Sequence, residues 1–427
     1  MVEKTGGRAA KVFVRQLRLT NYRNYRSFSA DFSDGLVVFT GHNGAGKTNL
    51  LEALSFLSPG RGVRRAAYDN VIRSNPVLGS AYGNAVNQRE DESLETFEKS
   101  GKQETVDSET TIAGLNSPIN EAEDSGFVVF AQLHSSLYGD ASIGTASDIT
   151  STGRRIRING ESVASDRLTD YCRISWLVPS MDGLFTGPAA DRRRFLDRMV
   201  LAIDPAHARR VSDFEKAMRA RNRLLTDGNR DERWFNALEV QMAELAIAIA
   251  AARMDVVRLI SDIENFDNEE TFPSPVLDIQ GTIEKALARK SAVDVEEEYR
   301  QSLHDKRESD RVAGRTLEGP HRSDMLVYYA RKNMPAGLCS TGEQKALLTG
   351  LVLSHAQLTS AISGMTPILL LDEMAAHLDP GRRKVLFDSL ERLGGQTFMT
   401  GTDQQLFADL KDRAQFFELS NGSVVNN

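Results

Sequence analysis

One stretch of the chain, residues 36–52, constrains the fold more than any other. It begins with five apolar or β-branched residues, Leu36 to Thr40, which have the composition of a buried strand. A glycine-rich loop of the form G-x-x-x-x-G-K-[ST] follows, with its fixed positions at Gly41, Gly46, Lys47 and Thr48. Leucines at helical spacing come next. The order strand, glycine loop and helix is the context in which this pattern binds phosphate.

The chemistry expected of this loop follows from its backbone. Glycines let N–H groups close around phosphate oxygens, and the start of a helix adds positive potential. We expect Lys47 to reach the β- and γ-phosphates of a nucleotide and the Thr48 hydroxyl to ligate Mg²⁺. An accidental glycine turn is the alternative, and the flanking strand and helix disfavour it. The predicted nucleotide-binding residues of the loop are Gly41, Asn43, Gly44, Ala45, Gly46, Lys47, Thr48 and Asn49.

A second acidic element lies far along the chain. Four consecutive apolar residues, Ile368 to Leu371, precede Asp372 and Glu373. A buried parallel strand delivers such residues to the crevice where ligands sit. We expect Asp372 to bind Mg²⁺ through water, and Glu373 to polarise the water that attacks the γ-phosphate. This would be the Walker B element, with Glu373 and Lys47 as catalytic residues.

The segment from Ser340 to Lys345 has two interpretations. Ser340 with Glu343 three residues later forms the capping box of a helix. The string Ser340-Thr341-Gly342-Glu343-Gln344 also resembles the signature motif of the ATP-binding-cassette (ABC) class. In that class the serine and glycine of one protomer complete the nucleotide site of the other. Both interpretations can hold together. The stretch from Met374 to Asp379 resembles the D-loop that links two such sites.

Four segments together resemble the RecF family, the SMC-like ABC ATPases of bacterial recombinational repair. They extend over most of the chain outside a polar insertion, and the third is the most specific. They are Leu17 to Tyr25 (LRLTNYRNY), Gly44 to Ala53 (GAGKTNLLEA), Gly187 to Asp197 (GPAADRRRFLD), and Gly319-Pro320-His321-Arg322 with the signature string.

The resemblance implies ATP and Mg²⁺ as cofactors and an ATP-dependent homodimer. It also implies binding to double-stranded and gapped DNA, and partnership with RecR, and through it RecO and RecA. Hydrolysis in the class is typically slow and serves release. The chain departs from related patterns in places. It has Thr400-Gly401-Thr402-Asp403 where transporters often have a histidine, and no glutamine marks a Q-loop near Val178.

The expected fold is α/β: an ABC-type ATPase head, with a mixed sheet, an antiparallel β layer and helices, and an inserted second lobe. We assign residues 1–75 to the N-terminal half of the ATPase lobe and 76–126 to a polar, acidic, disordered insertion. Residues 127–312 form the second lobe, with short strands and then a helical hairpin, and 313–427 the C-terminal half of the ATPase lobe. Helices are predicted from Pro205 to Thr226, Trp234 to Phe266 and Asp294 to Arg311.

Charge is unevenly distributed, although the net charge is −7. Eleven Asp/Glu stand against three Lys/Arg between Arg89 and Ser125, whereas twelve Lys/Arg face eight Asp/Glu between Phe185 and Trp234. The three arginines at 192–194 either contact DNA phosphates or pair within the protein, because adjacent positions point around a helix. The candidate DNA-binding residues are Arg61, Arg64, Arg65, Arg192 and Arg193.

No run of 18 apolar residues and no signal-peptide pattern is found, so we expect a cytoplasmic protein without a membrane partner. The two cysteines, Cys172 and Cys339, fit core thiols in a reducing compartment. Three other functions remain open: an ABC subunit of a transporter, an SMC-type DNA clamp, and a DNA-bound scaffold with a residual site. The first lacks its Q-loop, the second its long coiled coils, and Glu373 argues against the third.

Overall fold

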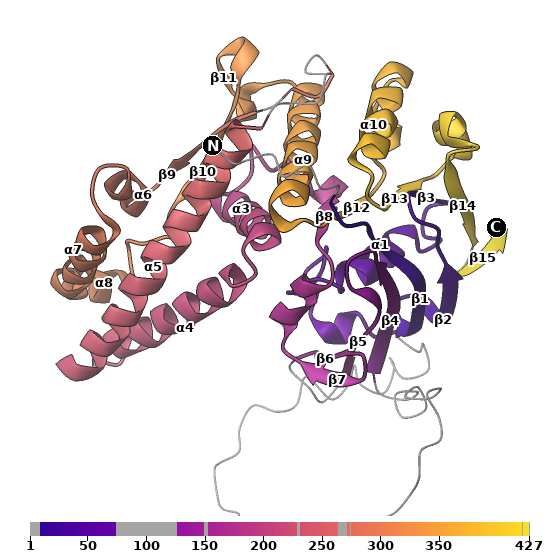
Figure 1. The fold of residues 1–427 in the computed structure, drawn as a ribbon. Helices are drawn as coiled ribbons and strands as arrows, with labels where there is room; N and C mark the ends of the chain where they lie inside the picture. The colour runs from indigo at the N-terminus through magenta and orange to yellow at the C-terminus, as the bar shows by residue number, and fades with distance from the viewer. Residues whose placement is uncertain are drawn as a thin grey trace, which may run out of the picture.

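The computed structural model describes residues 9–73, 126–148, 153–228, 231–263, 271–273, 275–420 and 422–426. The insertion predicted at 76–126 lies outside the described residues except for its last position. The described chain forms two packed sheets on one side and a helical lobe on the other (Figure 1).

A six-stranded, mainly parallel sheet carries the acidic strand and the strand before the glycine loop. Its order is β15-β14-β3-β13-β12-β8, with β15 antiparallel at the edge. The strands are β3 (Leu36–Thr40), β8 (Ile174–Leu177), β12 (Ile368–Leu371), β13 (Thr397–Gly401), β14 (Ala414–Ser420) and β15 (Ser423–Asn426). Both predicted central strands, β3 and β12, are therefore confirmed, and β13 lies between them.

The two faces of this sheet are buried in different cores, which explains why its strands read as unbroken apolar runs. In β12, Ile368 and Leu370 pack into one core and Leu369 and Leu371 into the other. The first core lies between this sheet and a six-stranded antiparallel sheet, and α1 (Lys47–Ser55) fills the space between the two.

The antiparallel sheet has the order β2-β1-β4-β5-β6-β7. Its strands are β1 (Val12–Tyr22), β2 (Tyr25–Asp31), β4 (Gly126–Ser135), β5 (Gly139–Asp148), β6 (Arg155–Ile158) and β7 (Glu161–Val163). This corrects the predicted division of the chain. The predicted second lobe begins at residue 127 with these strands, but β4 pairs with β1 and so belongs to the ATPase half. A non-local pairing of this kind leaves no signal in the local pattern.

Three helices cover the other face of the parallel sheet and share its second core. They are α3 (Ala189–Ile203), α9 (Thr341–Ser363) and α10 (Pro380–Leu393). Among the described residues, α9 alone is long and apolar enough to cross a membrane, and 72% of its apolar stretch is buried inside the protein, as in a core helix.

The helical lobe is formed by α4 (His207–Thr226), α5 (Glu232–Ser261), α6 (Thr282–Leu287), α7 (Ala292–Asp305) and α8 (Arg307–Ala313). A three-stranded sheet joins it, in the order β11-β10-β9, from β9 (Val276–Gln280), β10 (Asp324–Tyr329) and β11 (Met334–Pro335). The boundary predicted at residue 312 is therefore too early, since β10 pairs with β9. Short 3₁₀ segments are η1 (Tyr68–Asn70), η2 (Ser165–Asp170), η3 (Pro179–Met181), η4 (Ala330–Lys332), η5 (Ala336–Leu338), η6 (Met374–His377) and η7 (Gln404–Leu410).

Two predicted helix boundaries need correction. Pro205 was expected in the first turn of α4, but the helix begins at His207 after the N-cap residue Ala206. The helix predicted from Asp294 to Arg311 is two helices that meet at Lys306. The second of them, α8, presents Asp310 to the buried guanidinium of Arg221 at 2.7 Å. The predicted end of α5 at Phe266 falls outside the described residues, and the helix ends at Ser261.

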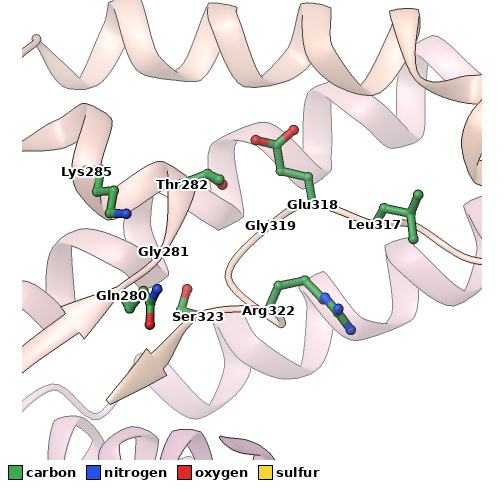
Figure 2. Close-up of a pocket in the computed structure, with 9 residues that line it drawn as sticks. All are labelled: Gln280, Gly281, Thr282, Lys285, Leu317, Glu318, Gly319, Arg322 and Ser323. Carbon is green, nitrogen blue, oxygen red and sulfur yellow. The ribbon is translucent and has the colours of Figure 1, made fainter. Parts of the chain in front are cut away.

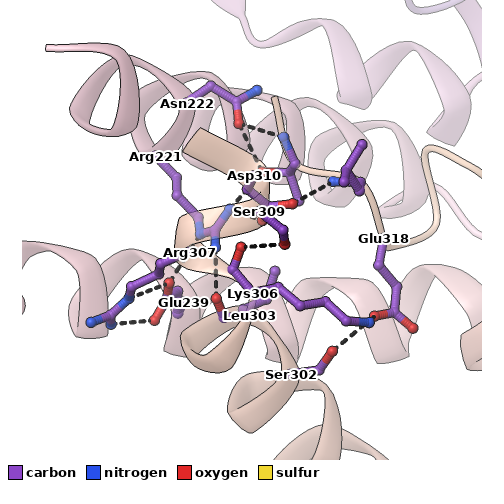
Figure 3. A network of polar contacts seen from close by, with 12 residues as sticks. Arg221, Asn222, Glu239, Ser302, Leu303, Lys306, Arg307, Ser309, Asp310 and Glu318 are labelled. Carbon is purple, nitrogen blue, oxygen red and sulfur yellow. Dashed lines mark hydrogen bonds and ion pairs between the residues drawn. The ribbon is translucent and has the colours of Figure 1, made fainter. Parts of the chain in front are cut away.

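A buried charge network holds the helical lobe together (Figure 3). Arg221 of α4 is fully buried and donates to Glu239 of α5, to Asp310 and to the Leu303 carbonyl. Glu239 also accepts from Arg307. A buried charge is tolerated only when its donors and acceptors are satisfied. The network therefore fixes how α4, α5 and α8 meet.

Candidate functional site

The glycine-rich loop joins β3 to α1 in the predicted arrangement. Its glycines at 41, 44 and 46 all have a positive φ, a backbone conformation that residues with a Cβ rarely adopt. A Cβ at Gly46 would also lie 2.4 Å from the Tyr25 hydroxyl. The Lys47 side chain is buried, and its ammonium donates to the carbonyls of Gly41 (2.7 Å) and His42 (3.0 Å). It therefore lies across the mouth of the loop.

Lys47 lies within the electrostatic reach of the acidic strand end. Burial lowers the pKa of Lys47, whereas the carboxylates of Glu373 and Asp372 act in the opposite direction. The two carbonyls and the two carboxylates favour the charged ammonium, against the effect of burial. This is the form that binds phosphate oxygens.

The structure brings Thr48 and Asp372 together from 324 positions apart in the chain. The Thr48 hydroxyl lies 3.0 Å from both carboxylate oxygens of Asp372, which is buried at the end of β12. No group of three or more His, Cys, Asp or Glu placed to hold a metal occurs among the described residues. One carboxylate and one hydroxyl fit Mg²⁺, which keeps waters and takes its other oxygens from phosphate.

Glu373 follows directly and has a left-handed backbone, with φ 54°. For a residue other than glycine this conformation costs about 1–3 kcal/mol and is found mostly where function requires it. The strain turns the chain out of β12 into η6. It leaves the Glu373 side chain half-buried, one residue beyond the Asp372 carboxylate.

Thr400 is a residue that the sequence analysis did not select. Its hydroxyl donates to Asp372 at 2.7 Å and accepts from the Glu373 N–H at 2.9 Å. Thr400 lies in β13, the strand between β3 and β12, so it reaches both carboxylate residues. Its place in the segment Thr400-Gly401-Thr402-Asp403, where transporters often have a histidine, was the available signal.

A second group missed by the sequence analysis braces the loop from the β1–β2 turn. Arg23 donates through two nitrogens to the fully buried Glu52 of α1, at 2.8 and 2.7 Å. Asn24 donates to the Ala45 carbonyl and accepts from Asn49 at 2.7 Å. The family string at 17–25 therefore orients the loop and its helix. Asn43 is exposed at the tip of the loop.

The signature segment forms the exposed start of α9, and both interpretations of it fit the structure. Ser340 caps the helix in a complete capping box with Glu343. An ion pair with Lys332, together with hydrogen bonds from Ser340, lowers the pKa of Glu343 to about 2. A Cβ on Gly342 would meet no atom within 4 Å, so this face of the helix is open. The hydrogen bonds of Ser340 remain within its own helix start.

Asp379 also serves as a helix cap. It is exposed at the start of α10, where its side chain accepts from the Arg382 N–H at 2.9 Å. The structure therefore gathers Lys47, Thr48, Asp372 and Glu373 into one site. It leaves the other half of the predicted site, Ser340, Gly342 and Asp379, at exposed helix starts.

The candidate DNA-binding arginines separate into two groups. Arg192 and Arg193 are engaged inside the protein, which favours the second interpretation of the arginine cluster, pairing within the protein, over contact with DNA. Arg192 pairs with Asp324 at 2.7 Å, and Arg193 donates to the Ser323 carbonyl at 2.7 Å. Both partners lie at the start of β10, which the local pattern could not place beside α3.

The other group remains at the surface. Arg61, Arg64 and Arg65 are all exposed, and Arg64 also donates to Asn49 at 2.6 Å. Burial and the charge of Arg194 lower the pKa of Arg65.

The loop Gly319-Pro320-His321-Arg322 lies in the helical lobe beside a pocket of about 210 Å³ (Figure 2). The Pro320 carbonyl accepts from Arg253, and the Glu318 carbonyl accepts from Tyr299. None of the predicted nucleotide-site residues lines this pocket. The loop is thus a braced element of the second lobe.

A phosphate loop beside an acidic strand end, on a parallel sheet faced by an antiparallel one, defines the fold of an ABC-type ATPase head. The RecF/RecN/SMC N terminal domain family matches residues 13–424. The chain is 51% identical to the DNA replication and repair protein RecF of Brucella suis biovar 1 (strain 1330), over 98% of this chain and 97% of that protein. It is 50% identical to RecF of Mesorhizobium japonicum, over 97% and 98%. The chain belongs to the RecF family.

Solved structures agree on the fold. A structure described as the recombination mediator protein RecF with ATPrS in the RecFOR pathway superposes with a TM-score of 0.76 and 19% identity, over 98% of this chain and 99% of that one. The corresponding RecF–ATP structure has a TM-score of 0.74, over 97% and 99%.

Proposed function

We propose that this chain is an ATP-dependent DNA-binding protein that dimerises on ATP and hydrolyses it slowly to release the dimer and the DNA. The observation that carries the proposal is the meeting of Thr48, Asp372 and Thr400 beside Lys47, at the mouth of a glycine loop. RecF structures described with ATP and ATPrS share this fold. The family is that of a DNA replication and repair protein.

Each residue of the site has a role that follows from its position. Lys47 would leave the loop carbonyls for the β- and γ-phosphates, and the backbone of 41–46 would bind their oxygens. Thr48 and Asp372 would hold Mg²⁺, which neutralises charge on the phosphates when bound. Glu373 would take the proton of the attacking water. Thr400 would fix the orientations of Asp372 and Glu373 relative to each other, because its hydroxyl bonds the Asp372 carboxylate and the Glu373 backbone N–H.

The second copy of the chain would complete the site. Ser340 and Gly342 offer an exposed, capped helix start, which suits the γ-phosphate of a nucleotide in another protomer. Asp379 would link the two sites across the dimer. Closed two-fold symmetry makes both sites equivalent.

DNA would bind on the surface that carries Arg61, Arg64 and Arg65. Phosphate contacts of this kind position a duplex and carry no sequence information. The family relationship supports duplex DNA next to single-stranded gaps as the substrate. It also supports RecR as a direct partner, RecO and RecA as indirect ones, and the cytoplasm as the location.

Two measurements test this proposal. Sedimentation velocity with and without ATP should show a dimer only with ATP, and the Lys47→Ala variant should remain monomeric. Binding to gapped, duplex and single-stranded DNA at two salt concentrations should be ATP-dependent and should weaken at the higher salt. A Lys47→Ala variant that dimerises with ATP would disprove the mechanism.

A further inference from the structure

The proposed nucleotide site has two halves, the glycine loop with Asp372 and the signature segment at Ser340. The residues that link these two half-sites lie in one segment of the chain, residues 178–187, between β8 and α3. We propose that Arg192 is a positioning residue that fixes this coupling segment, and thereby sets the signature helix of one copy for the nucleotide of the other. The inference rests on the proposed ATP-driven dimer. It assigns a role to the RecF-family string at 187–197.

The coupling segment begins at the acidic strand. β8 pairs in parallel with β12, so that Leu177 is the register partner of Leu371. The Asp372 N–H donates to the Leu177 carbonyl at 2.9 Å. The last residue of β8 therefore holds the backbone of the carboxylate that faces Thr48. Any shift of this strand end reaches the first residue of the coupling segment.

The other end of the segment touches the signature. Asp182 pairs with Lys345 of α9 at 2.9 Å, one turn after Ser340. A Cβ on Gly337 would lie 2.9 Å from the Phe185 carbonyl oxygen, so the two backbones are in close contact. Gly337 belongs to η5, three residues before Ser340. The segment therefore connects one half-site to the other within a single chain.

Arg192 locks this connection from α3. Two of its nitrogens donate to the two carboxylate oxygens of Asp324, at 2.8 and 2.7 Å. The third donates to the carbonyls of Gly187 at 2.6 Å and Leu184 at 3.3 Å. A planar guanidinium can bind a carboxylate through two nitrogens and keep the third for the loop backbone, whereas an ammonium has no such fork.

The ion pair between Arg192 and Asp324 also fixes a second stretch of chain that leads to the signature segment. Asp324 is the first residue of β10, from which the chain runs through β11 and η5 to Ser340. Arg192 thus holds both approaches to the signature: the coupling segment on one side and β10 on the other. The Arg192 side chain is 15% exposed, so water competes little for its contacts.

The neighbouring Arg194 provides a matched control. It lies on the same helix, is 44% exposed and, within the described part of the chain, pairs only with Asp191 one turn away. Replacing it removes the same charge from α3 without touching the coupling segment. A second variant, Gly337→Ala, disturbs the same contact with Phe185 but leaves the arginine in place.

The test compares Arg192→Ala, Arg192→Lys, Arg194→Ala and Gly337→Ala in three assays. These are the affinity of the monomer for a fluorescent ATP analogue, the ATP-dependent dimer by sedimentation velocity, and the turnover rate at saturating ATP. For Arg192→Ala and Gly337→Ala we expect monomer affinity within about twofold of wild type, with dimer affinity and turnover at least about tenfold lower. Arg192→Lys should not restore them, and Arg194→Ala should match wild type.

If Arg192 only stabilised the fold, its loss would lower nucleotide affinity, dimerisation and turnover together, because a smaller fraction of the protein would be folded. Should Arg192→Ala fail to fold in a thermal melt, Gly337→Ala decides, because it adds one methyl group and keeps the ion pair. Dimerisation and turnover of Arg192→Ala equal to those of Arg194→Ala would overturn the inference alone. A wild-type chain that shows no ATP-dependent dimer would overturn the proposed function and this inference with it.

Discussion

The two half-sites of this chain are built in opposite ways. Lys47, Thr48 and Asp372 lie between two sheets, where each polar group bonds another member of the same site. Ser340 and Gly342 lie at an exposed helix start, and among the residues that the structure describes the Ser340 side chain bonds only within that start. A site that is complete would need no exposed second half. The difference supports the proposal that the signature half completes the nucleotide site of a second copy of the chain.

Among the variants that test this comparison, the one that removes the proposed base, Glu373, should have the largest effect on turnover. Glu373→Gln keeps the shape of the side chain but removes its ability to accept a proton. We expect turnover to fall by about 10²- to 10⁴-fold, while ATP still drives dimerisation. Phosphate release and sedimentation velocity measure the two effects. Turnover at the wild-type rate would remove Glu373 from the mechanism.

Gly342→Ala tests the role of the exposed signature segment in dimerisation without disturbing the fold of the monomer. No atom lies within 4 Å of the added Cβ, so the monomer tolerates it. Alanine in a helix is favoured over glycine by about 0.5–1 kcal/mol. We therefore expect an equal or higher melting temperature, but an ATP-dependent dimer weakened about tenfold by crowding against the second copy. An unchanged dimer affinity would place the interface elsewhere.

Asp197 lies on α3, which packs against the signature helix α9, so a change at Asp197 tests how stably that helix is supported. Burial would raise the pKa of Asp197, but Arg253 and His207 outweigh it and hold the pKa at about 2. Because the folded-state pKa is depressed, this stabilisation is present above pH 4 and is lost as the pH falls towards 2. Asp197→Asn should lower the free energy of unfolding by about 2–3 kcal/mol at pH 7.

Urea denaturation at pH 7 and pH 3 measures the effect of Asp197→Asn. The difference from wild type should shrink at the lower pH. The exposed Asp191→Asn on the same helix is the control, with a change within about 0.5 kcal/mol. Equal destabilisation at both pH values would exclude the ion pair as its source.

The smallest effect is expected at the basic surface beside the catalytic half. Arg65→Ala should weaken binding to duplex DNA several-fold for all sequences and lower the salt slope by about one. Arg300→Ala, an exposed arginine on α7 paired with Glu297, should change neither. Fluorescence anisotropy in the presence of ATP, over a series of salt concentrations, measures both quantities.

The catalytic half could be predicted from the sequence because its information is local. A strand, a glycine loop and a lysine are contiguous, and four apolar residues end at Asp372 and Glu373. Parallel strands then bring the two segments to one edge of the sheet. The confirmed strands β3 and β12 have the same origin, since each is a short apolar run with a clear end.

The rest could not be predicted, because it depends on contacts between distant segments. Nothing near Gly126 indicates that β4 pairs with β1, so the domain division was wrong there. Arg192 and Arg193 read as a basic cluster until β10 supplies Asp324 and the Ser323 carbonyl. Thr400 becomes part of the site only when β13 lies beside β12.

Mixing two inactive variants tests the central claim most directly. Glu373→Gln lacks the base but has an intact Ser340, and Ser340→Arg lacks the signature but has an intact base. If one chain completes the site of the other, a mixed dimer contains one whole site. Equal mixing should then restore ATP turnover to at most about a quarter of the wild-type rate. No recovery on mixing, or full activity of Ser340→Arg alone, would contradict a site shared between two copies.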